Sequence, residues 1–112
     1  MTLPGPVPER LRGEGHRFVV QFGQALGRPV EFYSGAAAQA TEVLLAAIGR
    51  SNGSRASVTR QVFKATVRNG ILGHFSFDRK GDTTAGSVTV YRVVDGRARI
   101  VGLLTPSPAL VR

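Results

Sequence analysis

The sequence predicts a small α/β fold with about three helices, one short strand and a C-terminal β-hairpin. Apolar residues recur at helical spacing through the first half of the chain. Residues 87–104 instead form two β-prone runs, separated by Asp95-Gly96, a dipeptide typical of two-residue hairpin turns. The chain has 112 residues, of which 42% are hydrophobic, and this is enough for one domain with one modest core.

Residues 1–13 are predicted to be a proline-rich lead-in. Pro4, Pro6 and Pro8 exclude a regular helix there and favour an extended backbone. The segment has no apolar run like that of a secretory signal, so we expect that it is not one.

The first helix is predicted to end at Leu26 and to begin at either Glu9 or Glu14. Phe18, Phe22 and Leu26 are each four residues apart and form one apolar stripe at the helical period. The glycine that follows favours a left-handed C-cap, and the proline two residues later cannot continue the helix.

Three further elements complete the helical half. Val30–Tyr33 is predicted to form a brief strand, because its residues are β-prone and lie between a proline and a Ser-Gly pair. A second helix is predicted over about Gly35–Arg50 and a third over about Arg55–Thr66, with Ser54 as the N-cap of the third. The predicted buried face of the second helix comprises Ala36, Ala40, Val43, Leu44, Ala47 and Ile48.

The stretch Asn69–Asp82, NGILGHFSFDRKGD, is predicted to be the joint between the helices and the hairpin. Gly70 ends the third helix, and Gly73 precedes two phenylalanines that alternate with polar residues. We therefore divide the chain, as one partial domain, into a lead-in (1–13), a helical part (14–69), a hinge-like segment with the hairpin (70–104) and a tail (105–112).

The joint closes with a polar turn, Asp78-Arg79-Lys80-Gly81-Asp82. Its two aspartates suggest a metal loop, but the turn lacks the alternating acids of an EF-hand and has two basic residues between them. We favour a structural role instead. In that role Asp78 and Asp82 accept hydrogen bonds from nearby backbone N–H groups, and Gly81 adopts a positive φ.

The net charge of +8 allows two interpretations. A basic chain can bind nucleic acid or an acidic partner. The fifteen lysines and arginines are instead spread along the whole chain, and this favours an ordinary solvated surface. Nucleic acid is therefore not the partner that we expect, and a basic interaction or oligomerisation module is the alternative function.

No combination of residues in the sequence indicates catalysis or metal binding. The chain has no cysteine, and its two histidines, His16 and His74, are far apart. No glycine-containing stretch has the ending of a phosphate loop, and no serine stands in a nucleophile-elbow context. The longest apolar stretch, around Ala36–Ile48, is too short and too polar to span a bilayer. We expect a protein that is not an enzyme and uses no cofactor and no metal.

Three stretches, in this order, carry a resemblance to a known family. FVVQFGQALGRPV resembles F-x-x-x-F…Y-G-x-P, and SGAAAQATEVLLAAIGRSNGSRASVTRQVF resembles a long Ala-rich helix, a Gly-containing loop and the helix after it. NGILGHFSFDRKGDTTAGSVTVYRVVDGRARIVG resembles G-x-x-G-x-x-x-F-D-x-x-G-D with a terminal hairpin. From about Leu3 to Leu104 the chain is similar to the C-terminal part of type I periplasmic solute-binding proteins. These form the branched-chain amino-acid (leucine-binding) family of ABC importers.

The resemblance implies two α/β lobes, joined by three crossing segments, that hold a small polar ligand in the cleft between them. The chain would be a fragment of a periplasmic-binding-protein-like lobe. It would begin near the second crossing, add helices to the first lobe and cross back, and Gly70–Gly86 would lead into that hinge crossing. The implied partners are an amino-acid-like ligand and the membrane permease of an ABC importer. The implied location is extracytoplasmic, in the periplasm.

One ligand-binding residue can be carried over from the family. A cleft aromatic that follows the short strand after the first helix maps best to Tyr33, and a half-buried strand-end aromatic is the equal alternative. Early in the long helix the family often has Tyr-Asp-Ala, where this chain has Ala38-Gln39-Ala40. The family's usual amino-acid specificity therefore does not carry over.

The resemblance also predicts uncovered apolar surface. A third of a two-lobed protein lacks the parallel strands that its helices would cover. We therefore expect that the missing lobe of a longer protein, or another copy of the chain, supplies this layer.

Overall fold

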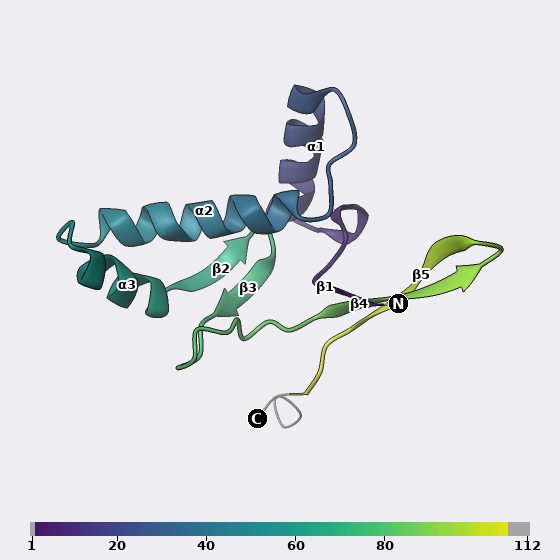
Figure 1. Ribbon diagram of the computed structural model, residues 1–112. Helices are drawn as coiled ribbons and strands as arrows, with labels where there is room; N and C mark the ends of the chain where they lie inside the picture. Colours follow the sequence, from purple (N-terminus) through teal and green to yellow (C-terminus); the bar gives the residue numbers. More distant parts are fainter. Residues whose placement is uncertain (1, 108–112) are drawn as a thin grey trace.

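The computed structural model describes residues 2–107, and the side chains of residues 5–107. It confirms an α/β fold, with three α-helices and two small antiparallel sheets in the described chain (Figure 1). The elements in chain order are β1 (Thr2–Pro4), the 3-10 helix η1 (Pro8–Arg10), α1 (Glu14–Leu26), α2 (Ser34–Gly49), α3 (Arg55–Phe63), β2 (Thr66–Gly70), β3 (Gly73–Ser76), β4 (Val88–Val94) and β5 (Arg97–Leu104).

The helices and the β2–β3 hairpin form what we call the body of the molecule. α3 and the hairpin lie along one side of α2, and α1 stands across the N-terminal end of α2 (Figure 1). The small core between them consists of the buried Val43, Ala65 and Phe75, with the partly buried Val67, Leu72 and Phe77 against them. The rings of Phe75 and Phe77 meet edge to face, with their centroids 5.8 Å apart.

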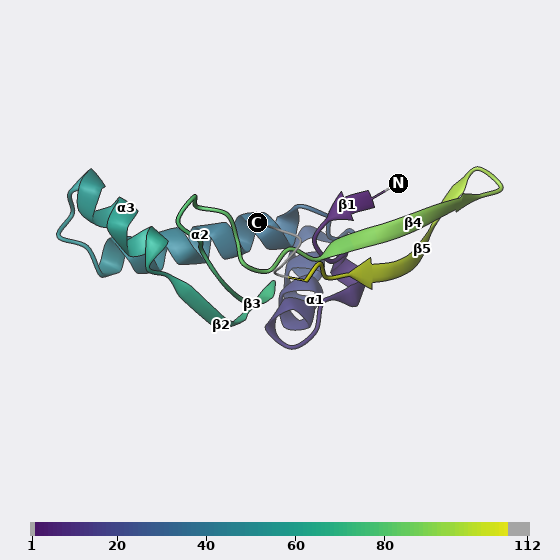
Figure 2. The ribbon, with the colours of Figure 1, turned by 90° about the horizontal axis from the view of Figure 1, so that it is seen from below.

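β1, β4 and β5 form a second sheet, which we call the arm and which projects away from the body (Figures 1 and 2). β4 is central and pairs antiparallel with both neighbours; at the tip, Val94 pairs with Arg97. The turn residues Asp95 and Gly96 have φ of 51° and 71°, as a type I′ hairpin turn requires. The structure therefore confirms the predicted hairpin.

Two predicted helix ends are confirmed. α1 ends at Leu26, and Gly27 follows in the left-handed region with φ 65°, where its N–H donates to the oxygen of Gly23 at 3.0 Å. Ser54 caps α3, because its Oγ accepts a hydrogen bond from the N–H of Ser57 at 3.2 Å. Both contacts satisfy backbone groups that a helix end leaves without an intrahelical partner.

The proline-rich start contains structure that the sequence did not predict. Thr2–Pro4 pairs with β4 as strand β1, and Pro8–Arg10 makes one 3-10 turn. β1 is an edge strand, where a proline without an N–H donor is tolerated. Of the predicted tail, residues 105–107 belong to no helix or strand, and residues 108–112 lie outside the described part of the chain.

The strand predicted at Val30–Tyr33 is wrong. These residues form a loop that curls into α2: the N–H of Ser34 donates to the oxygen of Glu31 at 3.1 Å, and the N–H of Ala37 donates to the oxygen of Tyr33 at 3.0 Å. Within the described residues no strand pairs with this segment, so the helix start overrides its β propensity.

The predicted helical part, residues 14–69, ends too late. α3 stops at Phe63, and Thr66–Gly70 pairs with Gly73–Ser76 as the β2–β3 hairpin. The β-branched Thr66 and Val67 favour a strand once β3 supplies a partner, and no local signal shows where that partner lies.

The buried face of α2 only partly matches the predicted one: Val43 and Ala47 are buried as predicted, but the buried side is rotated around the helix. The buried residues, each four apart, are Gly35, Gln39, Val43 and Ala47. The members of the predicted face that are exposed instead are Ala36, Ala40, Leu44 and Ile48. The side with Gly35 and Gln39 is buried because the β2–β3 turn approaches α2 closely there and Gln39 forms a hydrogen bond with it.

The molecule is more extended than a compact domain of its length. Its radius of gyration is 15.9 Å, against about 13 Å expected for this chain length. Its accessible surface is 8342 Å², against about 6,000 Å² for a compact monomer of this mass. Exposed large apolar side chains contribute to this surface, among them Leu44, Leu45 and Ile48 on α2 and Val101, Leu103 and Leu104 on β5.

Candidate functional site

Two chain segments connect the body to the arm and lie side by side (Figures 1 and 2). Gly5–Val7 leads from β1 into the body, and residues 84–87 lead from the body to β4. The N–H of Gly5 donates to the oxygen of Ser87 at 2.8 Å, and Oγ1 of Thr89 donates to the oxygen of Gly5 at 2.7 Å. We call these two segments the crossing, since they are the covalent links between body and arm in the described chain.

The sequence at the crossing explains how it is fixed. Gly5 stands between two prolines and has φ 88°, a left-handed conformation that glycine adopts without strain. Thr89 is only 1% exposed, so its hydroxyl needs a hydrogen-bond partner, and the carbonyl of Gly5 supplies it. The two segments are therefore held together at Gly5, which bonds to both Ser87 and Thr89.

The two-residue turn of the β2–β3 hairpin, Ile71 and Leu72, is the contact point between this hairpin and the helices. Ile71 is buried, and the N–H of Leu72 donates to Oε1 of Gln39 on α2 at 3.3 Å. Nε2 of Gln39 donates to Oε2 of Glu42 at 3.0 Å. Both ends of this carboxamide, which is buried in the body, are therefore paired.

The predicted hinge glycines Gly70 and Gly73 flank this turn and pair with each other across the hairpin. Gly73 has φ 88°. A Cβ at Gly70 would overlap the side chain of Gln39, and a Cβ at Gly15 would overlap the carbonyl oxygen of Ile71. The glycines thus permit a close approach of helix and hairpin, and they lie in the body, ahead of the crossing in the chain.

One aspartate organises the polar turn that follows β3. Oδ1 of Asp78 accepts hydrogen bonds from the N–H of Lys80 at 2.8 Å and of Asp82 at 2.9 Å. The bond from Asp82 is the main cause that lowers the pKa of Asp78 below its ordinary value of 3.8, and the bonds from Lys80 and Gly81 and the charge of Lys80 add to it. Gly81 has φ 90°, and Asp82 contributes its backbone N–H and carbonyl.

Tyr33 lies at the surface, directly before α2. Its side chain is 65% exposed, and its ring meets Phe32 edge to face with the centroids 4.9 Å apart. In the same loop, Nη1 of Arg28 and Oε1 of Glu31 form an ion pair at 2.6 Å. The strand-end setting considered for Tyr33 does not exist, because the loop contains no strand.

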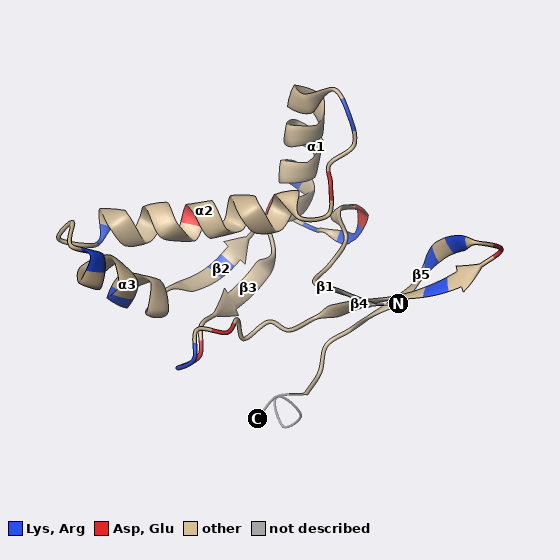
Figure 3. Ribbon diagram, viewed as in Figure 1, with Lys and Arg blue, Asp and Glu red and all other residues tan. Residues whose placement is uncertain are grey.

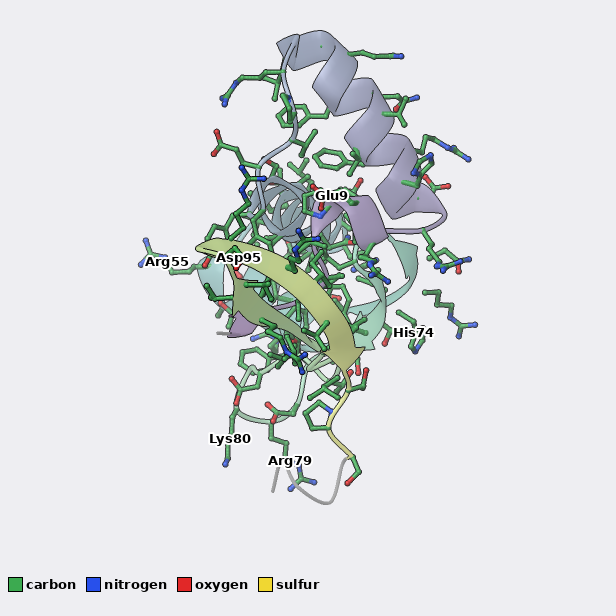
Figure 4. The ribbon with its side chains drawn as sticks, turned by 90° about the vertical axis from the view of Figure 1, so that its right-hand side faces the viewer. Glu9, Arg55, His74, Arg79, Lys80 and Asp95 are labelled. Atoms are coloured by element: carbon green, nitrogen blue, oxygen red, sulfur yellow. The ribbon has the colours of Figure 1, made fainter. Side chains whose placement is uncertain are left out.

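Basic side chains are distributed over both the body and the arm (Figure 3). Arg55 on α3, His74 on β3, and Arg79 and Lys80 in the polar turn point outward (Figure 4). No single basic face therefore stands out on the part of the chain that the structure describes.

An apolar groove of about 350 Å³ runs between α2, α3 and β3. Its lining residues include Ala40, Leu44, Val62, Phe75 and Phe77. No charged side chain lines the groove, so it offers no group that would neutralise a charged ligand.

The described residues contain no group of three His, Asp or Glu side chains that could hold a metal ion. None of their helices has the length and apolar character needed to cross a membrane.

The structure places the predicted site residues in three separate regions. These are the β2–β3 turn with Gly70 and Gly73, the polar turn with Asp78, Gly81 and Asp82, and the α1–α2 loop with Tyr33. Sequence reasoning missed Gln39 and Thr89. Gln39 had a signal, because it is a polar residue at four-residue spacing from Gly35 and Val43, whereas a threonine in a strand is too ordinary to indicate burial.

Comparison with solved structures identifies two similar chains. The leucine-binding protein LivK of Thermotoga maritima is 24% identical to this chain, with a TM-score of 0.78 over 94% of it. An ABC transporter substrate-binding protein of Desulfitobacterium hafniense, solved in complex with Leu, is 22% identical, with a TM-score of 0.70 over 89% of it. No protein-family model matches the chain, and a sequence comparison with curated proteins finds no relative.

The chain spans about 30% of the length of each of these two proteins. Its described helices, turns and arm thus form an arrangement that also occurs as a part of larger binding proteins. The chain therefore shares its fold with a part of each of these two proteins, as the sequence resemblance implies.

Proposed function

We propose that this chain works as part of a two-lobed, non-enzymatic solute-binding protein of an ABC import or sensing system. The observation that carries the proposal is the structural similarity to LivK over 94% of the chain. The ligand is a small polar molecule, amino-acid-like, held between the lobes outside the cytoplasm, and the loaded protein meets a membrane permease.

The separation of body and arm supports a hinge role for the crossing. The two parts are linked by two extended segments that share few hydrogen bonds, so bending there disturbs little packing. In this proposal the body belongs to one lobe and the arm to the other. Gly70, Gly73 and the Asp78–Asp82 turn fix the direction in which the chain enters the crossing.

Tyr33 is the ligand-facing residue in this proposal. Its ring is largely exposed, contacts Phe32 and stands at the start of α2, so it can stack on a ligand when a second lobe closes over it. Gln39 is not available to a ligand, since both ends of its carboxamide are bonded within the body.

A chimera tests the proposal. In LivK, the segment to which this chain is structurally similar is replaced by the chain, and the product is titrated calorimetrically with the twenty amino acids and related small amides. We expect a folded protein that binds at least one of them. A folded chimera that shows no binding to any compound of the panel would contradict a role in solute binding.

Variants of the chimera test Tyr33. Tyr33→Ala is expected to weaken binding about three- to tenfold, the value of one aromatic contact. Phe63→Ala, which removes a ring that is 46% exposed on α3, serves as the matched control and is expected to leave the affinity unchanged. Equal effects of both variants would remove Tyr33 from the proposed site.

The arm supports one alternative, a basic module that binds nucleic acid or an acidic partner. Arg92 on β4 lies directly opposite Arg99 on β5, and Arg97 follows the same turn. Like charges placed in this way destabilise a hairpin unless an anion neutralises them. Binding of duplex or single-stranded nucleic acid that weakens steeply with salt would favour this alternative, and no binding at low salt would eliminate it.

A further inference from the structure

We propose that the arm carries a docking face for an acidic segment of a partner protein, formed by Arg92 on β4 and by Arg97 and Arg99 on β5. We call these three residues the arginine face. All three are exposed, and Figure 3 shows basic segments on both strands of the arm near its tip. The inference deepens the proposed function by naming the chemistry of a partner, and it rests on that function for the cover of the opposite side of the arm.

The register of the hairpin puts the three arginines on one side of the sheet. Arg92 lies directly opposite Arg99, and Arg97 lies opposite Val94, which is two residues from Arg92. Because side chains alternate between the two sides of a strand, Arg92, Arg97 and Arg99 project from the same side. Opposite residues have Cβ atoms about 5 Å apart, and residues two apart on one strand are about 7 Å apart. The three guanidinium groups therefore share one small patch.

The other side of the same stretch of hairpin has no charged residue. It carries Tyr91 and Val93 of β4, which lie opposite Ile100 and Ala98 of β5. Tyr91 and Ile100 are already half-buried. An antiparallel sheet with one apolar and one charged side packs the apolar side on a core and leaves the charged side in water. The remaining part of a two-lobed protein therefore covers the side with Val93, and the arginine face stays outward.

The arginine face has no counter-charge within the described chain. The two ion pairs of the described residues involve Arg17 and Arg28, and neither reaches the arm. The pair of Arg92 and Arg99 places like charges directly opposite each other, which destabilises a hairpin. A local cost without a compensating contact inside the chain is typical of a functional surface. Carboxylates of a partner would neutralise these charges, since a guanidinium binds a carboxylate through two parallel hydrogen bonds.

Two neighbours of the arginine face favour a protein over a membrane surface or a nucleic acid. Val94 lies on the same side, opposite Arg97, and 38% of its surface is exposed. An apolar side chain among arginines suits a protein interface, which combines arginine and apolar contacts. Asp95 is exposed at the tip of the arm, and its carboxylate repels a continuous layer of phosphates. A protein segment with separate carboxylates can avoid that contact.

The body does not extend the arginine face into a larger basic surface. The arm projects away from the body, and the basic residues of the body are distributed over it (Figures 1, 2 and 3). Nucleic-acid binding uses a stripe or patch of basic residues that neutralises several phosphates. The arginine face is smaller and fits a short segment with two or three carboxylates. Acids at every second position of an extended segment repeat the spacing of about 7 Å between Arg97 and Arg99.

Fluorescence anisotropy with the whole chain tests the docking face. The probe is a labelled peptide in which three glutamates alternate with threonines, and the same peptide with glutamines in place of the glutamates is the blank. At low salt we expect the glutamate peptide to bind and the blank to show no binding. The triple variant Arg92→Gln, Arg97→Gln, Arg99→Gln, which we call the arm variant, is expected to weaken binding at least about tenfold.

A matched control removes three charges from the body. Arg55, Arg60 and Arg79 are exposed there, and the body variant replaces all three by glutamine. It lowers the net charge as much as the arm variant does, so it is expected to weaken peptide binding by less than about threefold, through long-range attraction alone. Circular dichroism establishes that both variants are folded. Equal losses in the two variants would overturn the docking face, because binding would then follow net charge.

Two further probes test the class of partner. Single-stranded DNA and vesicles of phosphatidylcholine with one-third phosphatidylglycerol are titrated with the wild type, the arm variant and the body variant. We expect the arm and body variants to bind each of these probes equally. A loss of DNA or vesicle binding that is specific to the arm variant and exceeds its loss of peptide binding would overturn the acidic protein partner in favour of a phosphate surface.

The LivK chimera tests whether the arginine face is outward in a complete two-lobed protein. In the chimera, the arm substitutions are expected to leave the melting temperature and the ligand affinity unchanged. Val93→Gln is expected to lower the melting temperature of the chimera, because it buries a polar group against the rest of the fold. In the whole chain by itself Val93 is 62% exposed, so the same substitution is expected to change little. Arm substitutions that destabilise the chimera as much as Val93→Gln would show that the arginine face is covered, and would overturn the proposal.

This inference and the proposed function fail separately. Peptide binding is measured on the whole chain and needs no amino-acid ligand, whereas the proposed function fails when the folded chimera binds no compound of its panel. If the glutamate peptide does not bind the wild-type chain at low salt, the docking face is overturned and solute binding is unaffected.

Discussion

Oε1 of Gln39 accepts a hydrogen bond from the backbone N–H of Leu72 at 3.3 Å, and this bond joins α2 to a turn 33 residues further along the chain. The buried Ile71 beside it is approached by Gly15 of α1 and by Gly35 of α2. The Ile71–Leu72 turn therefore contacts both α1 and α2.

Replacing Gln39 by alanine is expected to lower the free energy of unfolding by about 1–3 kcal/mol, because the N–H of Leu72 loses its partner in a buried place. Urea denaturation monitored by circular dichroism measures the change. Gln24→Ala, at an exposed position of α1, is the matched control and is expected to change stability by less than about 0.5 kcal/mol. Equal losses in the two variants would show that the bond contributes nothing.

Two helical glycines are expected to respond to alanine in opposite directions. Gly15→Ala brings a Cβ against the carbonyl oxygen of Ile71, and it is expected to destabilise the chain by about 1–3 kcal/mol. At Gly49, the last residue of α2, an added Cβ meets nothing within 4 Å, so alanine is expected to stabilise by up to about 0.5–1 kcal/mol. Thermal unfolding of both variants measures the two changes. A higher melting temperature for Gly15→Ala would contradict the close approach of Gly15 to Ile71.

Thr89→Val tests how the crossing is fixed. Valine keeps the shape of threonine but removes the hydroxyl that donates to the carbonyl oxygen of Gly5, so a loss of about 0.5–1.5 kcal/mol is expected. Because this bond ties Gly5 of the crossing to β4, limited proteolysis at the crossing is expected to accelerate. Thr66→Val, at an exposed position of β2, is the control, and a crossing that is cleaved no faster in Thr89→Val than in this control would rule out the role.

Asp78 is expected to make the polar turn sensitive to acid. Its pKa in the folded chain is lowered from the ordinary 3.8, so the stability it contributes is present above pH 3.8 and is lost as the pH falls through the lower, folded value. Asp78→Asn keeps an oxygen acceptor but removes the charge. The free energy of unfolding of this variant is therefore expected to fall less in acid than that of the wild type. Asp95→Asn, in the arm turn, is the control that should retain it. Carboxyl NMR titration that places the pKa of Asp78 at or above 3.8 would refute the expectation.

The elements that the sequence predicted well depend on interactions over a few residues. Gly27 ends α1, Ser54 caps α3, and Asp95-Gly96 turns the arm hairpin, as the local residue types indicate. The Asp78 turn has the hydrogen bonds that its residue types favour.

The tertiary structure decided what depends on distant partners. β1 exists because β4 pairs with it, and the bond from Thr89 to Gly5 spans 84 residues that no local pattern connects. The face of α2 was predicted only in part for the same reason. Val43 and Ala47 are buried as predicted, but the close approach of the β2–β3 turn buried Gly35 and Gln39 and left Leu44 and Ile48 exposed. The sequence alone determined the helices, caps and hairpin turn, whose hydrogen bonds are local. Which apolar face is buried, and which stays exposed, was decided only by the packing of segments far apart in the chain.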